Sequence, residues 1–379
     1  MEHKTRIKGN VHYVGVNDRN KHRFEGMWPL PYGVSYNSYL IDDEMVALVD
    51  TVDICYFEVY LRKIKQVIGE RPINYLIINH MEPDHSGSIR LIKQHYPGII
   101  IVGNKQTFGM IEGFYGVTGE QYLVKEGDFL ALGHHKLRFY MTPMVHWPET
   151  MMTFDETDGV LFSGDGFGCF GTVDGGFLDT RINVDKYWGE MVRYYSNIVG
   201  KYGSPVQKAL QKLGGLPISA ICSTHGPVWT ENIAKVIGIY DRLSRYDADE
   251  GVVIAYGSMY GNTEQMAEAI AEELSAQGVK NIVMHNVTKS HPSYIIADIF
   301  RYKGLIIGSP TYSNQIFPEV EALLSKILLR EVKGRYLGYF GSFTWAGAAV
   351  KRLAEFAEKS KFELVGDPVE MKQAMKDLT

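Results

Sequence analysis

Four side chains that can bind a metal ion stand in one short segment, His80-Met-Glu-Pro-Asp-His85. Imidazole and carboxylate groups are common ligands of divalent transition metals. The segment follows the apolar run 75–79, which is typical of a buried strand, and precedes the Ser-Gly-Ser of residues 86–88, which can begin a helix. We therefore expect these ligands to lie on a loop between a strand and a helix.

Three more candidate ligands occur in a similar setting. His146, Asp165 and His225 each come at or just after the end of a short apolar run, near Gly or Pro. Strand ends that meet at one edge of packed sheets can bring all of these side chains together. The predicted ligand set is His80, Glu82, Asp84, His85, His146, Asp165 and His225. This set is harder and more anionic than a zinc site dominated by histidine, which favours iron or manganese.

The remaining histidines and the cysteines carry no predicted chemistry. The pair His134-His135 falls in a predicted hairpin turn and is interpreted as solvated. The same interpretation applies to His3, His12, His22, His95, His285 and His291. The three cysteines are far apart and form no C-x-x-C pair, so they can build neither a disulfide framework nor a thiolate metal site within one chain. We expect Cys55, Cys169 and Cys222 to be small buried groups in a reducing compartment.

The composition is that of an ordinary globular protein. The chain has 379 residues, of which 45% are hydrophobic and 22% charged, which predicts about two or three domains. Its net charge of −5 comes from interspersed charges, so no basic patch indicates nucleic acid or an anionic membrane as a partner. No apolar run approaches the ~18 residues of a membrane span, and the N-terminus lacks a secretory signal. We expect a cytoplasmic protein.

The pattern of elements changes near residue 246. Before it, short apolar runs such as 11–16, 34–41 and 45–49 alternate with turns and occasional helices, the last two runs forming a predicted hairpin. After it, strands and helices alternate regularly, which is typical of a doubly wound parallel sheet. The polar stretch 244–251 reads as the linker. We predict an α/β protein with domains at 1–248 and 249–379.

Three loops of the second domain predict a flavin site. Residues 257–263 run from a strand into a helix and offer backbone amides and hydroxyls to a phosphate without a basic residue. Loops 309–314 and 342–347 follow the next strands of the sheet and carry aromatic side chains that can cover a planar ring. The predicted FMN contacts are Ser258, Met259, Tyr260, Gly261, Asn262, Thr263, Pro310, Thr311, Tyr312, Asn314, Ser342, Phe343, Thr344, Trp345 and Gly347.

A second glycine-rich segment is not expected to bind a nucleotide. Residues 166–171 match G-x-G-x-x-G, but this fingerprint must run directly into a helix, and a loop sequence follows here. We expect these glycines to let the backbone pass close to the metal site beside Asp165.

The metal-ligand pattern resembles that of the metallo-β-lactamase superfamily, whose usual motif is H-x-H-x-D-H. Glu82 replaces the second histidine of that motif. The pattern H-x-E-x-D-H followed by a flavodoxin-like domain is similar to the flavodiiron proteins, and this resemblance covers essentially the whole chain. It implies an αββα sandwich before the flavodoxin-like sheet. It also implies that His80, Glu82 and His146 bind one iron, that Asp84, His85 and His225 bind the other, and that Asp165 bridges them.

The same resemblance implies an activity and partners. The expected reaction is reduction of O2 to water, or of NO to N2O, at a non-haem diiron centre that receives electrons through FMN. Trp147 and Tyr195 are candidates for the pocket around the metals. The family's arrangement implies a head-to-tail homodimer or a dimer of dimers. Because three scattered cysteines cannot form a rubredoxin site, we expect a separate donor such as rubredoxin, a deazaflavin or an NADH-linked reductase.

Two alternatives have different signatures. A zinc hydrolase of the metallo-β-lactamase type with a flavodoxin-like accessory domain would contain zinc, and Glu82 argues against it. A plain electron carrier with a non-catalytic first domain would tolerate loss of Asp165, and the presence of a residue at every ligand position argues against it.

Overall fold

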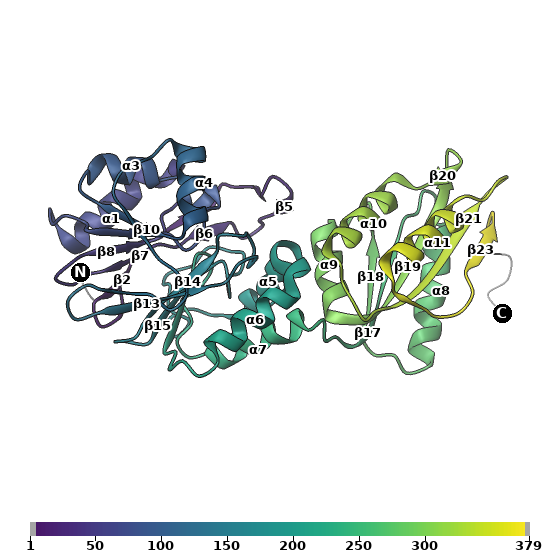
Figure 1. The fold of residues 1–379 in the computed structure, drawn as a ribbon. Coiled ribbons are helices and arrows are strands. Elements are labelled where there is room, and N and C mark those ends of the chain that lie inside the picture. Colours follow the sequence, from purple (N-terminus) through teal and green to yellow (C-terminus); the bar gives the residue numbers. More distant parts are fainter. Residues whose placement is uncertain (1–4, 376–379) are drawn as a thin grey trace. The chain divides into compact units, whose positions relative to one another are not determined.

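The computed structural model describes residues 5–375, which divide into two compact units (Figure 1). Within the described residues, the first comprises residues 5–194 and Ser204–Asp241, and the second comprises Tyr195–Gly203 and residues 242–375. The predicted boundary at 248/249 is close to this division but misses two parts of the second unit. The π-helix Tyr195–Val199 packs on a helix of the second unit, and the buried Arg335 guanidinium binds the carbonyl of Tyr246 at 2.8 Å.

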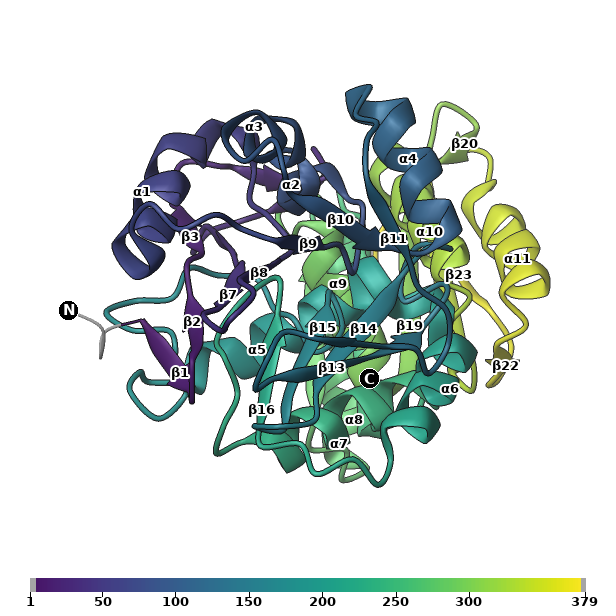
Figure 2. The same cartoon turned by 60° about the vertical axis from the view of Figure 1, so that its left-hand side comes forward.

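The first unit is an αββα sandwich, as the sequence predicts (Figures 1 and 2). One sheet has the strand order β1-β2-β7-β8-β9-β10-β11 and is parallel from β8 onward. Its strands are β1 Arg6–Lys8, β2 Val11–Tyr13, β7 Tyr39–Ile41, β8 Ala47–Val49, β9 Tyr75–Ile77, β10 Ile100–Gly103 and β11 Gln121–Leu123. The other sheet runs in chain order through β12 Phe129–Ala131, β13 Lys136–Met141, β14 Met151–Asp155, β15 Val160–Gly164 and β16 Ala220–Ser223.

Helices cover the outer faces of both sheets (Figure 2). Those on the first sheet are α1 Phe57–Ile68, α2 Pro83–Ser86, α3 Ile89–His95 and α4 Lys105–Tyr115. Those on the second are α5 Asp185–Tyr194, α6 Gly203–Leu213 and α7 Ile233–Ser244. The short pairs β3 Val16–Asp18 with β6 Val34–Tyr36 and β4 Arg23–Phe24 with β5 Trp28–Pro29 stand apart from both sheets.

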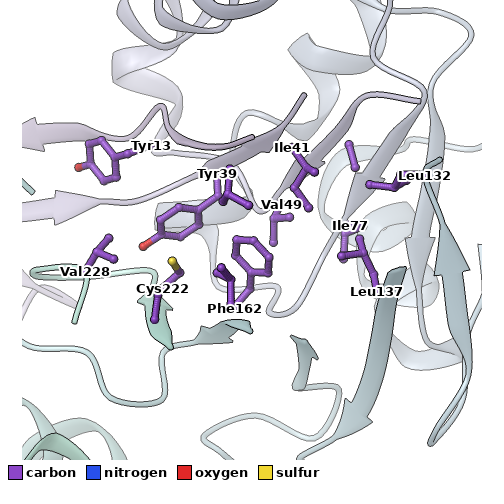
Figure 3. Close-up of a cluster of buried hydrophobic side chains, with 14 of the residues drawn as sticks. Tyr13, Tyr39, Ile41, Val49, Ile77, Leu132, Leu137, Phe162, Cys222 and Val228 are labelled. Carbon is purple, nitrogen blue, oxygen red and sulfur yellow. The ribbon is translucent and has the colours of Figure 1, made fainter. Parts of the chain in front are cut away.

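The hydrophobic core lies between the two sheets (Figure 3). Tyr39 and Val49 of the first sheet face Phe162 and Cys222 of the second, and all four side chains are buried. Because alternate residues of a strand point to the same face, central strands such as β7 and β8 contribute every second side chain to this core, whereas the edge strand β11 is exposed. Burial of this face fixes the strand register that carries the candidate ligands at the strand ends.

Two predicted strands are each divided in the structure. The run 34–41 forms β6, which pairs with β3, and β7, which pairs with β2. Asn37 separates them because its buried amide donates to the carbonyls of Ser223 and Gly226, at 2.9 and 2.8 Å. The run 11–16 is divided in the same way between β2 and β3. The predicted hairpin is correct, since β7 and β8 pair antiparallel across residues 42–46.

Several side chains interpreted as exposed or buried lie in the opposite environment. His12 and His135 are buried, whereas Cys55 is exposed on the surface. Each buried histidine has a partner that a sequence pattern does not reveal: Thr5 at 3.0 Å from His12, and Asp155 at 2.9 Å from His135. His285 and His291 are half-buried, and His22, His95 and His134 are exposed as predicted, while His3 lies outside the described residues.

The His135–Asp155 pair predicts a pH-dependent contribution to stability. Burial lowers the pKa of His135, but Asp155, with Asp158 and Asp43 nearby, outweighs burial and raises it above the ordinary value. The stabilisation is therefore complete below the unfolded-state pKa and is lost as pH rises through the folded-state pKa. We expect His135→Gln to cost about 1–2 kcal/mol at pH 6 and clearly less at pH 9 in denaturant unfolding. His134→Gln, at the exposed neighbouring position, should cost nothing at either pH, and an equal loss from His135→Gln at both pH values would contradict the pairing.

The second unit is a doubly wound sheet with the order β18-β17-β19-β21-β22, parallel throughout (Figure 1). Helix α8 packs on one face of the sheet. Helices α9 and α11 also contact the sheet, and α10 packs against both of these helices. The strands are β17 Asp249–Tyr256, β18 Ile282–Asn286, β19 Tyr302–Tyr312, β21 Tyr336–Phe343 and β22 Glu363–Leu364, with β20 Gln315–Ile316 and β23 Val369–Lys372 paired to β19 and β21. The helices are α8 Asn262–Ala276, α9 Pro292–Arg301, α10 Pro318–Arg330 and α11 Ala349–Ser360. Across residues 5–375, no helix has the length and apolar character needed to cross a membrane.

Candidate metal centre and flavin site

The structure brings all seven predicted ligands together at one end of the sandwich. His80 and Glu82 follow β9, while Asp84 and His85 lie on the short helix α2. The other three follow strands of the second sheet: His146 in the loop between β13 and β14, Asp165 after β15, and His225 after β16. All seven side chains are buried.

One group of ligand atoms surrounds Oδ2 of Asp165. The His146 Nε2 atom lies 3.1 Å from this oxygen and 3.1 Å from Oε2 of Glu82. The His80 Nε2 atom lies 3.7 Å from each of the same two oxygens and 3.4 Å from His146 Nε2. Two imidazoles and two carboxylate oxygens therefore face one point.

A second group surrounds the other oxygen of Asp165. The His85 Nε2 atom lies 3.1 Å from Oδ1 of Asp165 and 3.5 Å from Oδ1 of Asp84. The His225 Nε2 atom lies 3.3 Å from Oδ2 of Asp84 and 3.7 Å from Oδ1 of Asp165. Asp165 thus presents one oxygen to each group, which is the arrangement of a carboxylate between two cations.

The chemistry of these atoms fits two metal ions. Neighbouring ligands of an octahedral ion with bonds of about 2.1 Å lie roughly 3.0 Å apart, close to the separations found here. Both oxygens of Asp84 and the Nε2 atoms of His85 and His225 are buried and have no hydrogen-bond partner among the described residues. Buried polar atoms without partners are rare in native proteins, and a cation between them would satisfy all of them at once.

The pKa values of two ligand side chains, His85 and Glu82, are strongly shifted from their ordinary values. Burial lowers the pKa of His85, but the negative charges of Asp84 and Asp165 outweigh burial and raise it to about 10. Burial raises the pKa of Glu82, but hydrogen bonds from His146 and His80 outweigh burial and lower it to about 2. A metal ion that enters the site must therefore displace imidazole protons, so binding releases protons at neutral pH.

Three further residues orient the ligands. The carboxylate of Glu149 lies 2.6 Å from His80 Nδ1, and the carbonyl of Ser35 lies 2.8 Å from His225 Nδ1. The Thr224 hydroxyl donates to Oδ1 of Asp165. None of these three residues is predicted from the sequence. Glu149 stands three residues after His146 and Thr224 directly precedes His225, whereas no sequence signal points to Ser35.

The pocket prediction was right for Trp147 and wrong by one residue for tyrosine. The Trp147 ring lies 5.2 Å from that of His80 and 6.2 Å from that of His146. Tyr194, at the end of α5, packs against His225 at 5.8 Å. The π-helix begins with the next residue, and Tyr195 packs against Phe300 of the second unit.

The glycine-rich segment 166–171 leads into no helix, as predicted, and passes beside the ligands. A Cβ atom at Gly168 would lie 3.1 Å from the carbonyl oxygen of Asp165 and 3.6 Å from the Cβ atom of His225. A side chain at this position would therefore crowd two of the ligand-bearing residues.

The predicted flavin loops surround a pocket of about 480 Å³ in the second unit. All predicted residues except Ser258, Gly261 and Gly347 line it, and Ser313, Ala346, Gln373 and Ala374 line it in addition. Two aromatic side chains are unusually exposed, Tyr260 at 90% and Trp345 at 81%. Large exposed aromatic groups beside a pocket are typical of a binding site for an apolar ring.

The N-terminus of α8 forms the polar end of this pocket. Gly261 has φ +91°, a conformation that favours glycine, and no side chain caps the helix. The first amides of α8 therefore remain available to an anion. The hydroxyl groups of Thr263 and Ser342 lie 2.9 Å apart at the same end. These groups fit a phosphate in the manner that the sequence predicts.

Comparison with known proteins identifies the family. Residues 34–226 match the domain described as ODP family beta lactamase, and residues 254–378 match flavodoxin. The chain is 32% identical over 363 residues to an anaerobic nitric oxide reductase flavorubredoxin from Vibrio vulnificus, covering 94% of this chain and 73% of that protein. The chain belongs to the flavodiiron protein family.

Solved structures of flavodiiron proteins have the same fold over nearly the whole chain. Rubredoxin oxygen:oxidoreductase from Desulfovibrio gigas superposes with a TM-score of 0.93 at 32% identity, covering 97% of this chain and 92% of that chain. The flavodiiron protein from Giardia intestinalis gives a TM-score of 0.93 at 28% identity, covering 97% and 90%. The predicted resemblance and two-domain fold are confirmed, and this flavodiiron chain is an oxidoreductase.

Proposed function

We propose that this flavodiiron chain reduces O2 to water, NO to N2O, or both, at a non-haem diiron centre that receives electrons through FMN. The division of the Asp165 oxygens between two groups of ligands carries this proposal, because it provides two adjacent cation positions. His80, Glu82 and His146 would hold one iron, and Asp84, His85 and His225 the other. The irons and the flavin supply the redox chemistry.

Buried aromatic side chains close one side of these positions, while a pocket of about 460 Å³ is lined by Glu82 and Asp84 on another. The aromatic rings of Phe24 and Phe170 lie 6.1 and 5.0 Å from that of Tyr194, which also contacts His225. These buried groups exclude water from the side of the centre that carries His225. The Tyr194 hydroxyl has no hydrogen-bond partner among the described residues. Burial, together with the charges of Asp165 and Glu82, raises the pKa of Tyr194, so it stays protonated and can donate a hydrogen bond to a diatomic molecule at the centre.

The flavin pocket has separate parts for each end of FMN. The uncapped amides of α8 and the Thr263 and Ser342 hydroxyls would bind the phosphate. Tyr260, Tyr312 and Trp345 would cover the isoalloxazine ring. We infer FMN rather than a dinucleotide because the pocket of about 480 Å³ ends at this single helix N-terminus.

The two alternatives are less well supported. The zinc hydrolase with a flavodoxin-like accessory domain is disfavoured because metallo-β-lactamase-type enzymes place a histidine where this chain has Glu82. A plain electron carrier would not need seven buried ligand side chains, of which Asp84, His85 and His225 have buried polar atoms without a hydrogen-bond partner among the described residues.

The proposed reaction also needs an electron donor and a short path from the flavin to the metals. A rubredoxin, a deazaflavin or an NADH-linked reductase is expected to reduce the FMN. A head-to-tail homodimer, alone or as a dimer of dimers, would bring the FMN of one subunit close to the metals of its partner. The cytoplasmic location stays a prediction.

The proposed function is tested by reducing the flavin anaerobically and then adding O2 or NO in separate experiments, with each candidate donor supplied in turn. We expect the protein to consume at least one of the two gases repeatedly as long as a donor is present. A flavin that the donor reduces fully but that neither O2 nor NO reoxidises, with neither gas consumed, would exclude the proposed reaction. If light scattering showed a monomer in a preparation with full turnover, the proposed dimer would be excluded, but the proposed reaction would not.

A further inference from the structure

Glu149 contacts the metal centre without being one of the predicted ligands. Its side chain is completely buried. One oxygen, Oε1, lies 2.6 Å from Nδ1 of His80 and accepts the backbone N–H of Met81 at 2.9 Å. The other oxygen, Oε2, is buried and has no hydrogen-bond partner among the described residues. A full carboxylate therefore stands directly behind one histidine of the Glu82 group.

The histidines of the other group have weaker support. The Nδ1 atom of His225 faces a neutral backbone carbonyl, that of Ser35, at 2.8 Å. The Nδ1 atom of His85 is buried and has no hydrogen-bond partner among the described residues. In addition, the Thr224 hydroxyl donates to Oδ1 of Asp165, the oxygen that faces this group, and so withdraws electron density from it. The protein thus hydrogen-bonds a buried carboxylate directly to His80, whereas Asp50, the buried carboxylate whose charge also acts on His85, accepts hydrogen bonds from Asn79 and leaves the Nδ1 atom of His85 without a partner among the described residues.

This asymmetry has a direct consequence for metal affinity. A carboxylate that accepts the Nδ1 hydrogen of a histidine fixes the ring orientation and makes Nε2 a stronger donor. A buried carboxylate oxygen without a partner is also costly, and a nearby cation offsets part of that cost. Both effects favour metal binding at the position of His80, Glu82 and His146 over the position of Asp84, His85 and His225.

We propose that the two positions of the metal centre differ in affinity, and that Glu149 is the positioning residue that makes the position of His80, Glu82 and His146 the tighter one. This inference rests on the two-metal centre of the proposed function. It predicts that the centre fills in order, with the tighter position occupied before the position of His85 and His225.

The test is an anaerobic titration of the metal-free, FMN-loaded protein with Co²⁺, followed by its visible absorption and by competition with a chelator. We expect two binding steps whose dissociation constants differ by at least about tenfold. Glu149→Gln keeps an acceptor for His80 but removes the charge, and should weaken the tighter step by about 10–100-fold while leaving the weaker step within about threefold. Glu149→Asp should retain part of the affinity.

Matched variants assign the steps to positions. Glu156→Gln, which changes a partly exposed glutamate paired with Arg138, should leave both steps unchanged. His225→Asn should abolish the weaker step and keep the tighter one, which decides the question even if Glu149→Gln does not fold. Two equal steps in the natural protein, equal weakening of both by Glu149→Gln, or loss of the tighter step in His225→Asn would each overturn the inference.

The titration is independent of turnover. Two ordered Co²⁺ steps in a protein whose iron-loaded form consumes neither O2 nor NO would contradict the proposed function and support the asymmetry. An iron-loaded protein that consumes O2 or NO, but whose metal-free form binds Co²⁺ in two equal steps, would support the proposed function and contradict the asymmetry.

Discussion

Replacing Asp165 with asparagine is expected to empty the metal centre and to lower O2 and NO consumption by more than about 100-fold. Mutation of residues that only orient metal ligands typically costs 10–100-fold in affinity or activity, and Asp165 faces both metal positions. The asparagine has the same shape but loses the negative charge that offsets two cations. Iron content per chain and gas consumption with a reduced flavin measure the effect.

The flavodoxin-like unit provides an internal control for this variant. Its FMN pocket is built from residues 259–374, far from Asp165 in the sequence, so FMN content should not change. Asp174→Asn alters an exposed carboxylate that pairs with Arg19 and should keep full iron content and full turnover. Undiminished gas consumption by Asp165→Asn would favour the electron-carrier alternative.

Replacing Gly261 with valine is expected to weaken FMN binding by about 5–30-fold and to lower turnover at limiting flavin without loss of iron. A left-handed backbone costs a residue with a side chain about 1–2 kcal/mol, and β-branched residues are the least tolerant of it. In the variant, the loop can relieve this strain by leaving the conformation that binds the phosphate, so FMN binding loses about 1–2 kcal/mol. Because about 1.4 kcal/mol corresponds to a factor of ten in Kd, this loss gives the stated range. No neighbouring atom lies within 4 Å of the added Cβ position, so the effect comes from the backbone rather than from a clash.

The same helix offers a matched control. Gly278 follows α8 with φ +92°, and its added Cβ would also meet no atom within 4 Å. Gly278→Val should therefore cause a similar loss of stability with normal FMN binding, measured by flavin fluorescence on titration. If both variants weakened FMN binding equally, binding of the FMN phosphate would not depend specifically on the loop at Gly261.

The sequence predicts the ligands because metal chemistry restricts residue type and because strand ends are visible as apolar runs. His146, Asp165 and His225 follow separate strands, yet the sandwich brings His146 and Asp165 to Glu82 and brings His225 to Asp84. The alternation of strands and helices predicts the second unit equally well, since each apolar run forms a strand of the parallel sheet, although the edge strands β18 and β22 are half-buried and exposed.

The sequence does not predict contacts that depend on how a loop turns in space. Glu149 reaches His80 across 69 positions of the chain, and Ser35 reaches His225 with a backbone carbonyl that every residue possesses. Tyr194 and Tyr195 have the same side chain, and only the start of the π-helix decides which one packs against His225. His135 is buried because Asp155 pairs with it from the neighbouring strand, which hydropathy alone cannot show.

The most direct test of the diiron account combines metal analysis with flavin reoxidation in one preparation. The purified, FMN-loaded protein should contain about two iron atoms per chain, and its anaerobically reduced flavin should be reoxidised rapidly by O2 or by NO. About two zinc atoms per chain without iron, together with a reduced flavin that neither gas reoxidises, would contradict the account.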